Sequence, residues 1–282
     1  MSEILYGVPL AERLRGELRE RVAALNARGV QPCLALVRVG EDPGSLSYER
    51  ATLRASEKMG IATRSVVLPE SCGTETLAET LRRVCTDPGV HGCLPLRPLP
   101  KQIDTPRAFA ALSPEKDLDG VTDASLRHVF TGRGSGFAPC TPEAVLMLLD
   151  AYDIPLDGAK VCILGRSLVT GRPLSMLLLA RNATVTICHT HTVDEAALCR
   201  EADIIVSAIG KAGHVTADYV SGKQVLIDVG TKPDANGKLR GDADFEAVAP
   251  LVRAISPVPG GVGAVTTAVL LRHVVEAAEA LS

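Results

Sequence analysis

The chain has 282 residues, of which 46% are hydrophobic and 22% are charged. At roughly 150 residues per domain, this length predicts about two domains, each large enough to bury a core. The 30 Lys and Arg residues against 33 Asp and Glu residues give a net charge of −3, which argues against nucleic-acid binding. Four Tyr, four Phe and no Trp likewise argue against a base-stacking surface.

The first residues of the chain and its cysteines indicate a cellular compartment. The N-terminal residues lack the basic and apolar regions of a signal peptide, and no run of about 18 apolar residues predicts a membrane span. We therefore expect a cytosolic protein that does not bind a membrane. The eight cysteines include no CxxC pair, and most lie in apolar runs, which predicts buried, reduced thiols.

The first half of the chain alternates helical patterns with short apolar runs. Helices are expected where apolar residues recur at helical spacing, over 9–26, 45–59 and 74–85. Strands are expected at short apolar runs, over 33–39, 63–68 and 90–96. Gly60 is expected to end the second helix. This alternation is typical of βαβ units, and so of an α/β fold with a parallel sheet.

The pattern starts again near residues 141–143, where we expect a domain boundary. Thr141, Pro142 and Glu143 predict the start of a helix, with Thr141 as its N-cap. Further strands are expected over 160–164, 184–188, 203–208 and 225–229, with helices between the first three. A loop rich in Pro and Gly at 256–263 precedes a last helix, expected over 264–281.

The segment 160–173 has the pattern of a nucleotide-binding turn. An apolar strand leads into Gly165, and a helix follows near Gly171. Glycine lets the backbone approach a diphosphate closely, while the first N–H groups of the helix face the anion. The spacing is Gly-x5-Gly instead of GxGxxG, so an ordinary strand-to-helix turn stays open as the alternative.

The residues around this turn favour NADP over NAD. The next predicted strand is followed by His189 and Thr190, and not by the carboxylate that usually binds a free ribose 2′-hydroxyl. Arg166 and Ser167 lie in the turn, and a cation with a hydroxyl suits a 2′-phosphate. The alternative for Arg166 is a solvated loop residue. His189 and His191 lack a third ligand at suitable spacing, so no metal site is expected.

Short motifs along the chain occur in the order and spacing of one enzyme family. They lie at 98–100, 114–120, 139–142, 165–167, 183–189, 202–205, 227–230 and 257–263. Together they resemble the FolD-type methylenetetrahydrofolate dehydrogenase/methenyltetrahydrofolate cyclohydrolase, over nearly the whole chain. No single motif is specific, but the combination is.

The resemblance implies a fold, an assembly and two reactions. The fold is a folate-binding catalytic domain of residues 1–142, onto which the helix at 264–282 packs back, and a Rossmann-like NADP-binding domain of residues 143–263. A folate cleft lies between the domains, and homodimers are usual. The reactions, which belong to one-carbon metabolism and purine biosynthesis, are oxidation of 5,10-methylenetetrahydrofolate by NADP⁺ to the 5,10-methenyl compound and hydrolysis of that product to 10-formyltetrahydrofolate.

The resemblance also implies site residues. Tyr48 matches the tyrosine that lies against the folate, and Asp119 matches the aspartate that binds the pterin, while Pro259, Gly260 and Gly261 are further substrate-binding positions. A half-buried helix tyrosine and a turn aspartate are the respective alternatives for the first two. The implied cofactor-binding residues are Gly165, Arg166, Ser167, Gly171, Pro173, His189, Thr190, Gly230 and Thr231.

Two catalytic positions depart from the family pattern. The family lysine, four residues after the tyrosine, is Thr52, and the glutamine that holds it, in Val-Gln-Leu-Pro-Leu-Pro, is Leu96. Only eight residues of the chain are Lys, and the first is Lys58, ten residues after Tyr48 or about 15 Å along a helix. Arg97 is expected to face the other side of a strand, so it does not replace the lysine.

These departures predict which activity survives. Thr cannot act as an ammonium group, and the side chain of Leu can neither donate nor accept a hydrogen bond. The sequence therefore favours an NADP-dependent methylenetetrahydrofolate dehydrogenase whose cyclohydrolase step is lost or weak. The alternatives are a bifunctional enzyme with a rearranged site and a non-catalytic paralogue that binds NADP or folate.

Overall fold

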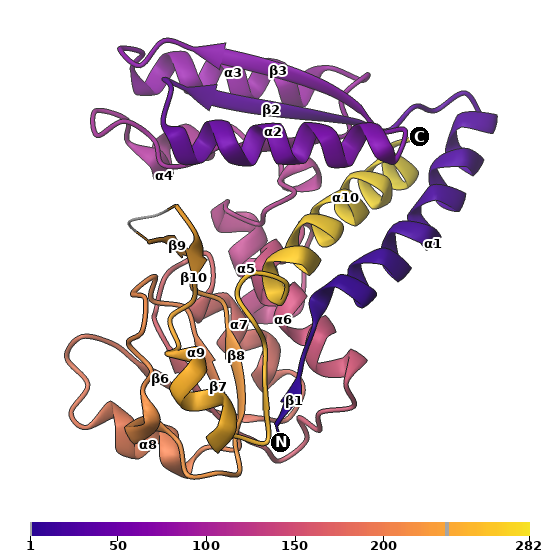
Figure 1. Cartoon of the computed structure of the whole chain (residues 1–282). Coiled ribbons are helices and arrows are strands. Elements are labelled where there is room, and N and C mark those ends of the chain that lie inside the picture. Colours follow the sequence, from indigo (N-terminus) through magenta and orange to yellow (C-terminus); the bar gives the residue numbers. More distant parts are fainter. Residues whose placement is uncertain (1, 235–236) are drawn as a thin grey trace. The chain divides into compact units, whose positions relative to one another are not determined.

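The computed structural model describes residues 2–234 and 237–282, and these divide into two compact units (Figure 1). The N-terminal unit comprises Arg13–Cys140 and Thr267–Ser282. The C-terminal unit comprises Thr141–Thr266 and the residues up to Glu12. Helices α1 (Gly7–Ala27) and α10 (Val262–Leu281) each contribute residues to both units. The α/β fold with parallel sheets predicted from the sequence is confirmed.

In the N-terminal unit, β2 (Cys33–Val39) pairs in parallel with β3 (Ala62–Leu68) on one side and β4 (Gly92–Pro95) on the other. Every residue of β2 is buried, as expected for a central strand that is covered on both faces. The remaining elements are α2 (Pro43–Lys58), α3 (Thr74–Thr86), α4 (Thr105–Phe109), the 3₁₀ helix η1 (Pro114–Lys116) and α5 (Asp123–Thr131). The core between the sheet and α3 and α4 includes Ala35, Leu77 and Phe109.

In the C-terminal unit, parallel strands run in the order β1-β11-β8-β7-β5-β6. Their bounds are β1 (Glu3–Ile4), β5 (Lys160–Leu164), β6 (Thr184–Cys188), β7 (Ile204–Ser207), β8 (Val225–Asp228) and β11 (Ala254–Ile255). The other elements are α6 (Cys140–Ala151), α7 (Gly171–Leu179), α8 (Glu195–Glu201), η2 (Ala217–Tyr219), the antiparallel pair β9 (Lys232–Pro233) and β10 (Leu239–Arg240), α9 (Phe245–Val248) and η3 (Ala249–Leu251). Because β5 lies between β6 and β7, the strand order reverses there, and ligands of such sheets bind at this point.

The predicted element bounds differ from the structure at three informative places. Helix α6 begins at Cys140, so Thr141 lies inside its first turn and is not the N-cap. Strand β4 ends at Pro95, one residue before Leu96. The short strands β1 and β11 were not expected, because two residues are too few to show an apolar pattern.

Strand β1 also changes the expected division of the chain. The sequence analysis assigns residues 1–142 to one domain, whereas the residues up to Glu12 belong to the C-terminal unit. The physical reason is backbone pairing, since Glu3 and Ile4 lie in parallel register with Ala254 and Ile255 of β11. The last helix is divided as well, with Thr267–Ser282 in the N-terminal unit.

The state of the cysteines agrees with the sequence analysis. All eight cysteines are free thiols, and all except Cys85 are buried, as predicted. Within residues 2–234 and 237–282, no helix is long and apolar enough to cross a lipid bilayer.

A buried ion pair holds α2 against the central strand of the N-terminal unit. The Arg38 Nε atom of β2 donates to Glu49 Oε2 of α2 at 2.7 Å, and the two side chains are only 10% and 8% exposed. Arg38 also donates to the carbonyl oxygen of Gly40. At the start of α2, Asp42 Oδ1 accepts from Ser45 N at 2.9 Å and caps the helix. These bonds fix the position of α2, which carries Tyr48 and Thr52.

We expect Arg38→Met to lower the free energy of unfolding by about 3–5 kcal/mol, because it leaves the Glu49 carboxylate buried without its partner. The double variant Arg38→Met/Glu49→Met buries no charge and is expected to recover most of this loss. Urea unfolding of the wild type, both single variants and the double variant measures the coupling. A single Arg38 variant no less stable than the double variant would contradict the interpretation.

Candidate active site

Helix α2 presents two of the residues selected from the sequence, but in different environments. Tyr48 and Thr52 are four residues apart and therefore share one face of the helix. Tyr48 is 38% exposed, whereas Thr52 is fully buried. In the described part of the chain, the Thr52 hydroxyl has no hydrogen-bond partner. Thr52 thus brings no polar group to the surface on which Tyr48 is exposed.

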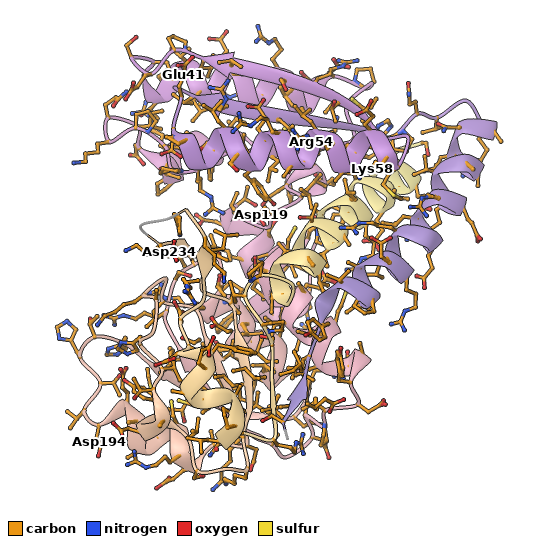
Figure 2. All side chains as sticks on the ribbon, viewed as in Figure 1. Glu41, Arg54, Lys58, Asp119, Asp194 and Asp234 are labelled. Atoms are coloured by element: carbon orange, nitrogen blue, oxygen red, sulfur yellow. The ribbon has the colours of Figure 1, made fainter. Side chains whose placement is uncertain are left out.

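Leu96 is buried as well, and no lysine on α2 compensates for the change. Leu96 is 3% exposed, and its backbone N–H donates to Val37 O at 2.8 Å, which continues the pairing with β2. Lys58 is the last residue of α2, and Figure 2 shows it with Arg54 along this helix. Ten residues of helix separate Lys58 from Tyr48, a rise of about 15 Å. The side chains of Thr52 and Leu96 therefore offer neither a charge nor a hydrogen bond to a ligand.

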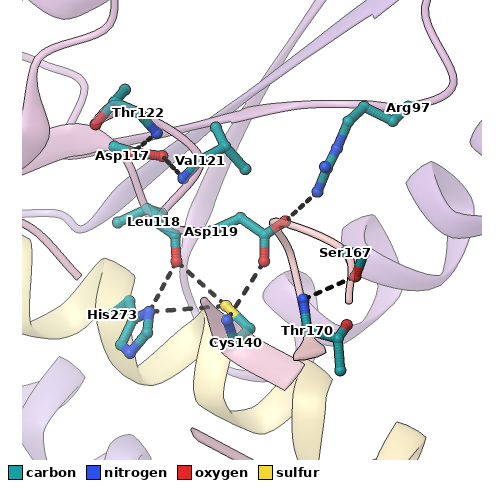
Figure 3. Close-up of polar contacts among 10 residues, drawn as sticks. All are labelled: Arg97, Asp117, Leu118, Asp119, Val121, Thr122, Cys140, Ser167, Thr170 and His273. Carbon is teal, nitrogen blue, oxygen red and sulfur yellow. Dashed lines mark hydrogen bonds and ion pairs between the residues drawn. The ribbon is translucent and has the colours of Figure 1, made fainter. Parts of the chain in front are cut away.

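Asp119 lies in a loop that hydrogen bonds hold in place (Figure 3). The fully buried Asp117 accepts from Val121 N at 3.0 Å, from Thr122 N at 2.8 Å and from Ser125 Oγ at 2.7 Å. The Asp119 side chain is 23% exposed. Because Asp117 ties both sides of the turn together, the loop presents Asp119 in a fixed orientation.

The structure corrects the sequence analysis at Arg97. Its Nη2 atom lies 2.9 Å from Asp119 Oδ2 in an ion pair, instead of facing away (Figure 3). The expectation failed because β4 ends at Pro95, so strand alternation does not extend to residue 97. The prolines at 95 and 98 are the sequence signal for an early strand end.

Burial and neighbouring charges shift the pKa values of Asp119 and Tyr48. Burial raises the pKa of Asp119, and the nearby Asp117 raises it further. The charge of Arg97 and the Cys140 N–H group, which lies 3.4 Å from Oδ1, lower this pKa and so oppose the shift. Burial also raises the pKa of Tyr48, and the nearby charge of Asp119 raises it further. Tyr48 therefore stays a neutral hydroxyl at neutral pH.

A buried histidine of α10 supports the backbone next to Asp119. His273 Nδ1 lies 2.8 Å from Leu118 O, and only an N–H on Nδ1 can make this bond. The Cys140 thiol donates to the same oxygen at 3.2 Å, and the Phe137 ring stacks on the His273 ring at a centroid distance of 4.6 Å. The sequence analysis did not select His273, because no local motif marks it and its partner is far away in the chain.

In the C-terminal unit, Gly165 and Gly171 allow a very close packing of strand and helix. Gly165 has φ +113°, and a Cβ atom there would lie 2.6 Å from Ala208 O. A Cβ atom on Gly171 would lie 2.0 Å from Gly165 O. Neither distance is sterically possible, so both positions require glycine. This turn places the start of α7 next to the carboxyl end of β5, where an anion can bind the helix N–H groups.

The other residues selected for the cofactor lie around this turn and at the neighbouring strand ends. Arg166 and Ser167 are exposed, and Ser167 Oγ accepts from Thr170 N at 3.1 Å. Pro173 is buried in the first turn of α7. After β6, His189 Nδ1 accepts from His191 N at 3.2 Å, and the next residue, Thr190, is exposed. In the described ranges, no three His, Cys, Asp or Glu side chains are arranged to hold a metal ion.

Two buried carboxylates hold the loops that follow β7 and β8. Asp228 accepts from Gly230 N at 3.1 Å and from Asp242 N and Ala243 N at 2.9 Å each. Asp242 accepts in turn from the backbone N–H groups of Ile209 and Lys211, at 2.8 and 2.7 Å. Burial raises the pKa of Asp228 to about 7, against the effect of its N–H donors.

The sequence analysis missed the roles of both carboxylates. Asp228 lies inside a motif used for the resemblance, whereas Asp242 has no motif. A Cβ atom on Gly230 would lie 2.0 Å from Asp242 Oδ1, so this position also requires glycine, and the exposed Thr231 follows it. The two aspartates therefore shape the backbone at the ends of β7 and β8.

The last selected residues lie in the loop between β11 and α10, within the C-terminal unit. Pro259 is joined to Val258 by a cis peptide bond, and Gly260 has φ +104°. The Gly260 carbonyl oxygen accepts from Gly7 N at 2.8 Å. A Cβ atom on Gly261 would lie 2.6 Å from Pro257 O. This loop is thus a tightly folded backbone segment in which Pro259 is exposed and Gly261 is buried.

We expect Gly171→Ala to disrupt the turn and to lower the free energy of unfolding by about 1–3 kcal/mol, because the added methyl group overlaps Gly165 O. Urea unfolding measures the effect. The matched control is Gly16→Ala in α1, where a Cβ atom meets nothing within 4 Å and a gain of up to about 1 kcal/mol is expected. Equal stability of the Gly171 variant and the wild type would contradict the steric argument.

Comparison with known proteins assigns a family to both parts of the chain. Residues 5–119 match the model of the tetrahydrofolate dehydrogenase/cyclohydrolase catalytic domain, and residues 139–282 match the model of its NAD(P)-binding domain. The bifunctional protein FolD of Carboxydothermus hydrogenoformans is 44% identical, with 100% of this chain and 99% of the relative covered. FolD 1 of Desulfitobacterium hafniense is 43% identical, with 98% and 99% covered.

Solved structures of enzymes with the same name have the same fold as this chain. The bifunctional FolD of Campylobacter jejuni has a TM-score of 0.97 at 36% identity, with 99% of each chain covered. The Trypanosoma brucei enzyme, solved in complex with NADP and an inhibitor, has a TM-score of 0.94 at 32% identity, with 99% and 98% covered. The chain therefore belongs to the tetrahydrofolate dehydrogenase/cyclohydrolase family.

Proposed function

We propose that this protein oxidises 5,10-methylenetetrahydrofolate with NADP⁺ and that its cyclohydrolase activity is lost or very weak. The observation that carries the proposal is the burial of Thr52 and Leu96. It leaves no charge and no accessible hydrogen-bonding side chain at the two positions that the resemblance assigns to the family lysine and glutamine. Tyr48 and Asp119, by contrast, are present and partly exposed. The folate-binding residues are thus retained, while those that act on water are not.

The residues of the C-terminal unit fit NADP. Gly165 and Gly171 allow the tight turn that brings the start of α7 next to the end of β5, where helix N–H groups can bind a diphosphate. Arg166 and Ser167 offer an exposed cation and hydroxyl to a 2′-phosphate. The T. brucei relative was solved with NADP. When bound, NADP⁺ supplies the hydride acceptor. The further cofactor contacts that we propose are Pro173, His189, Thr190, Gly230 and Thr231.

The oxidation requires mainly that the substrate is held in place. The hydride leaves a carbon that the adjacent nitrogens already activate, so no side chain has to transfer a proton. Asp119 can accept from the N–H and amino groups of the pterin ring. Tyr48 provides an exposed aromatic surface for the folate, and Pro259, Gly260 and Gly261 are proposed as further substrate contacts.

Hydrolysis of the methenyl product requires more. A water molecule has to be activated, and a proton has to move between groups of suitable pKa. Tyr48 stays protonated, and the Thr52 hydroxyl is buried. Arg97 brings a cation to the site, but a guanidinium stays charged at neutral pH and does not exchange its proton as a lysine ammonium can. Arg97 therefore does not favour the alternative of a rearranged bifunctional site.

Following both steps with purified protein by absorbance tests the proposal. We expect NADPH to form from methylenetetrahydrofolate and NADP⁺, and the methenyl compound to accumulate. Its decay should proceed at the rate of the enzyme-free solution. Decay that accelerates with enzyme concentration would contradict the loss of cyclohydrolase activity, and binding of cofactor without any turnover would favour the non-catalytic paralogue.

The double variant Thr52→Lys/Leu96→Gln is expected to gain enzyme-dependent hydrolysis of methenyltetrahydrofolate, because it restores an ammonium group and a hydrogen-bonding partner for it. The control Thr52→Met/Leu96→Gln has a side chain of similar length without the charge and should gain nothing. Circular dichroism checks that both variants are folded. A folded double variant without hydrolysis would mean that other parts of the site have diverged too.

A further inference from the structure

The Arg97–Asp119 ion pair lies close to the start of α2, the helix that carries Tyr48. The side chains of Arg97 and Asp119 are 34% and 23% exposed, so the pair is partly buried but still accessible to a ligand. Ser45, one turn of α2 before Tyr48, donates its hydroxyl to Arg97 O at 3.0 Å. Two charged side chains from separate segments thus meet beside this helix in the N-terminal unit.

Arg97 is held in position by its backbone as well as by its charge. The hydrogen bond from Ser45 Oγ holds its carbonyl group. The guanidinium Nη2 atom binds Asp119 Oδ2 at 2.9 Å, while Oδ1 lies 3.4 Å from Cys140 N. The orientation of the guanidinium is therefore set from both ends, which is unusual for a solvated surface arginine.

The pair offers both kinds of hydrogen-bonding group to a ligand. A carboxylate only accepts hydrogen bonds, whereas a guanidinium carries five N–H donors and only donates. The pterin ring of a folate presents N–H and amino donors beside a ring carbonyl oxygen, which is an acceptor. Asp119 alone can bind the donors but not the carbonyl oxygen, and Arg97 supplies the missing donor.

We propose that Arg97 is a specificity-determining residue, which donates to the ring carbonyl oxygen of the folate while it keeps Asp119 oriented towards the adjacent ring donors. This inference rests on the proposed function, since it concerns the folate of that reaction. According to this inference, the Arg97–Asp119 pair selects a 2-amino-4-oxo ring over a 2,4-diamino ring. In the diamino ring an amino donor replaces the carbonyl oxygen and faces the N–H groups of Arg97.

Two ligands that differ at this edge of the ring test the proposal. Folic acid has an oxo group beside an N3–H donor, whereas aminopterin has an amino group beside an N3 atom that carries no hydrogen at pH 8. Isothermal titration calorimetry at pH 8 measures both dissociation constants for the wild type. We expect folic acid to bind about 10- to 100-fold more tightly, because the amino ligand leaves the Arg97 N–H groups without an acceptor and Asp119 without the N3–H donor.

Variants of Arg97 separate its role from a structural one. Arg97→Leu should lower the ratio of the two dissociation constants several-fold, mainly by weakening folic acid. The preference that remains comes from the N3–H group, which only folic acid offers to Asp119. Arg97→Lys keeps a charge beside Asp119 without the planar fork, and we expect an intermediate ratio. The control is Arg107→Leu, which removes an arginine that pairs with Glu75 on the exposed surface of the same unit and should leave the ratio unchanged.

A ratio near one in the wild type, or an unchanged ratio in Arg97→Leu, would overturn the inference. The binding measurement does not depend on turnover, so its outcome is separate from that of the proposed function. Selective binding that depends on Arg97, in a protein without dehydrogenase activity, would support the inference and contradict the proposed reaction. Normal dehydrogenase turnover, with a ratio of dissociation constants that is the same in the wild type and in Arg97→Leu, would support the proposed reaction and contradict the inference.

Discussion

The parallel pairing of β2 with β4 determines which side chains meet in the N-terminal unit. Val37 lies in register with Pro95, so both strands end at the same edge of the sheet. The chain leaves β2 to form α2, which carries Tyr48, and leaves β4 directly into Arg97. Parallel strands always bring the segments after them to one edge, which is where α/β sheets bind their ligands.

Burial then decides which chemistry remains at this edge. Tyr48 and Thr52 share a face of α2, yet Tyr48 is partly exposed and Thr52 is completely covered. A Thr hydroxyl without a partner in a protein interior costs free energy and does nothing for a ligand. Leu96 is buried too, with only 3% of its surface exposed. Neither position therefore offers a ligand a charge or an accessible hydrogen-bonding side chain.

Uniform apolar runs were easy to predict, and short or irregular segments were not. The strands at 33–39, 160–164 and 184–188 have the predicted bounds, because apolar and β-branched residues make up most of each strand. Strands β1 and β11 are two residues long and are defined by tertiary pairing, of β1 with β11 and of β11 with β8. The carboxylates of Asp228 and Asp242 hold loops from different parts of the chain, which no local pattern records.

Three features could be read from the residue types and their order: the family resemblance, the glycine turn at 165–171 and the absence of a lysine at position 52. Such features depend on covalent chemistry and local spacing, and they are therefore readable without coordinates. Tertiary structure alone decided that Arg97 pairs with Asp119 and that His273 supports the neighbouring peptide group. The reason is that a long side chain after a strand end can point in several directions. Only packing against distant segments selects one of them.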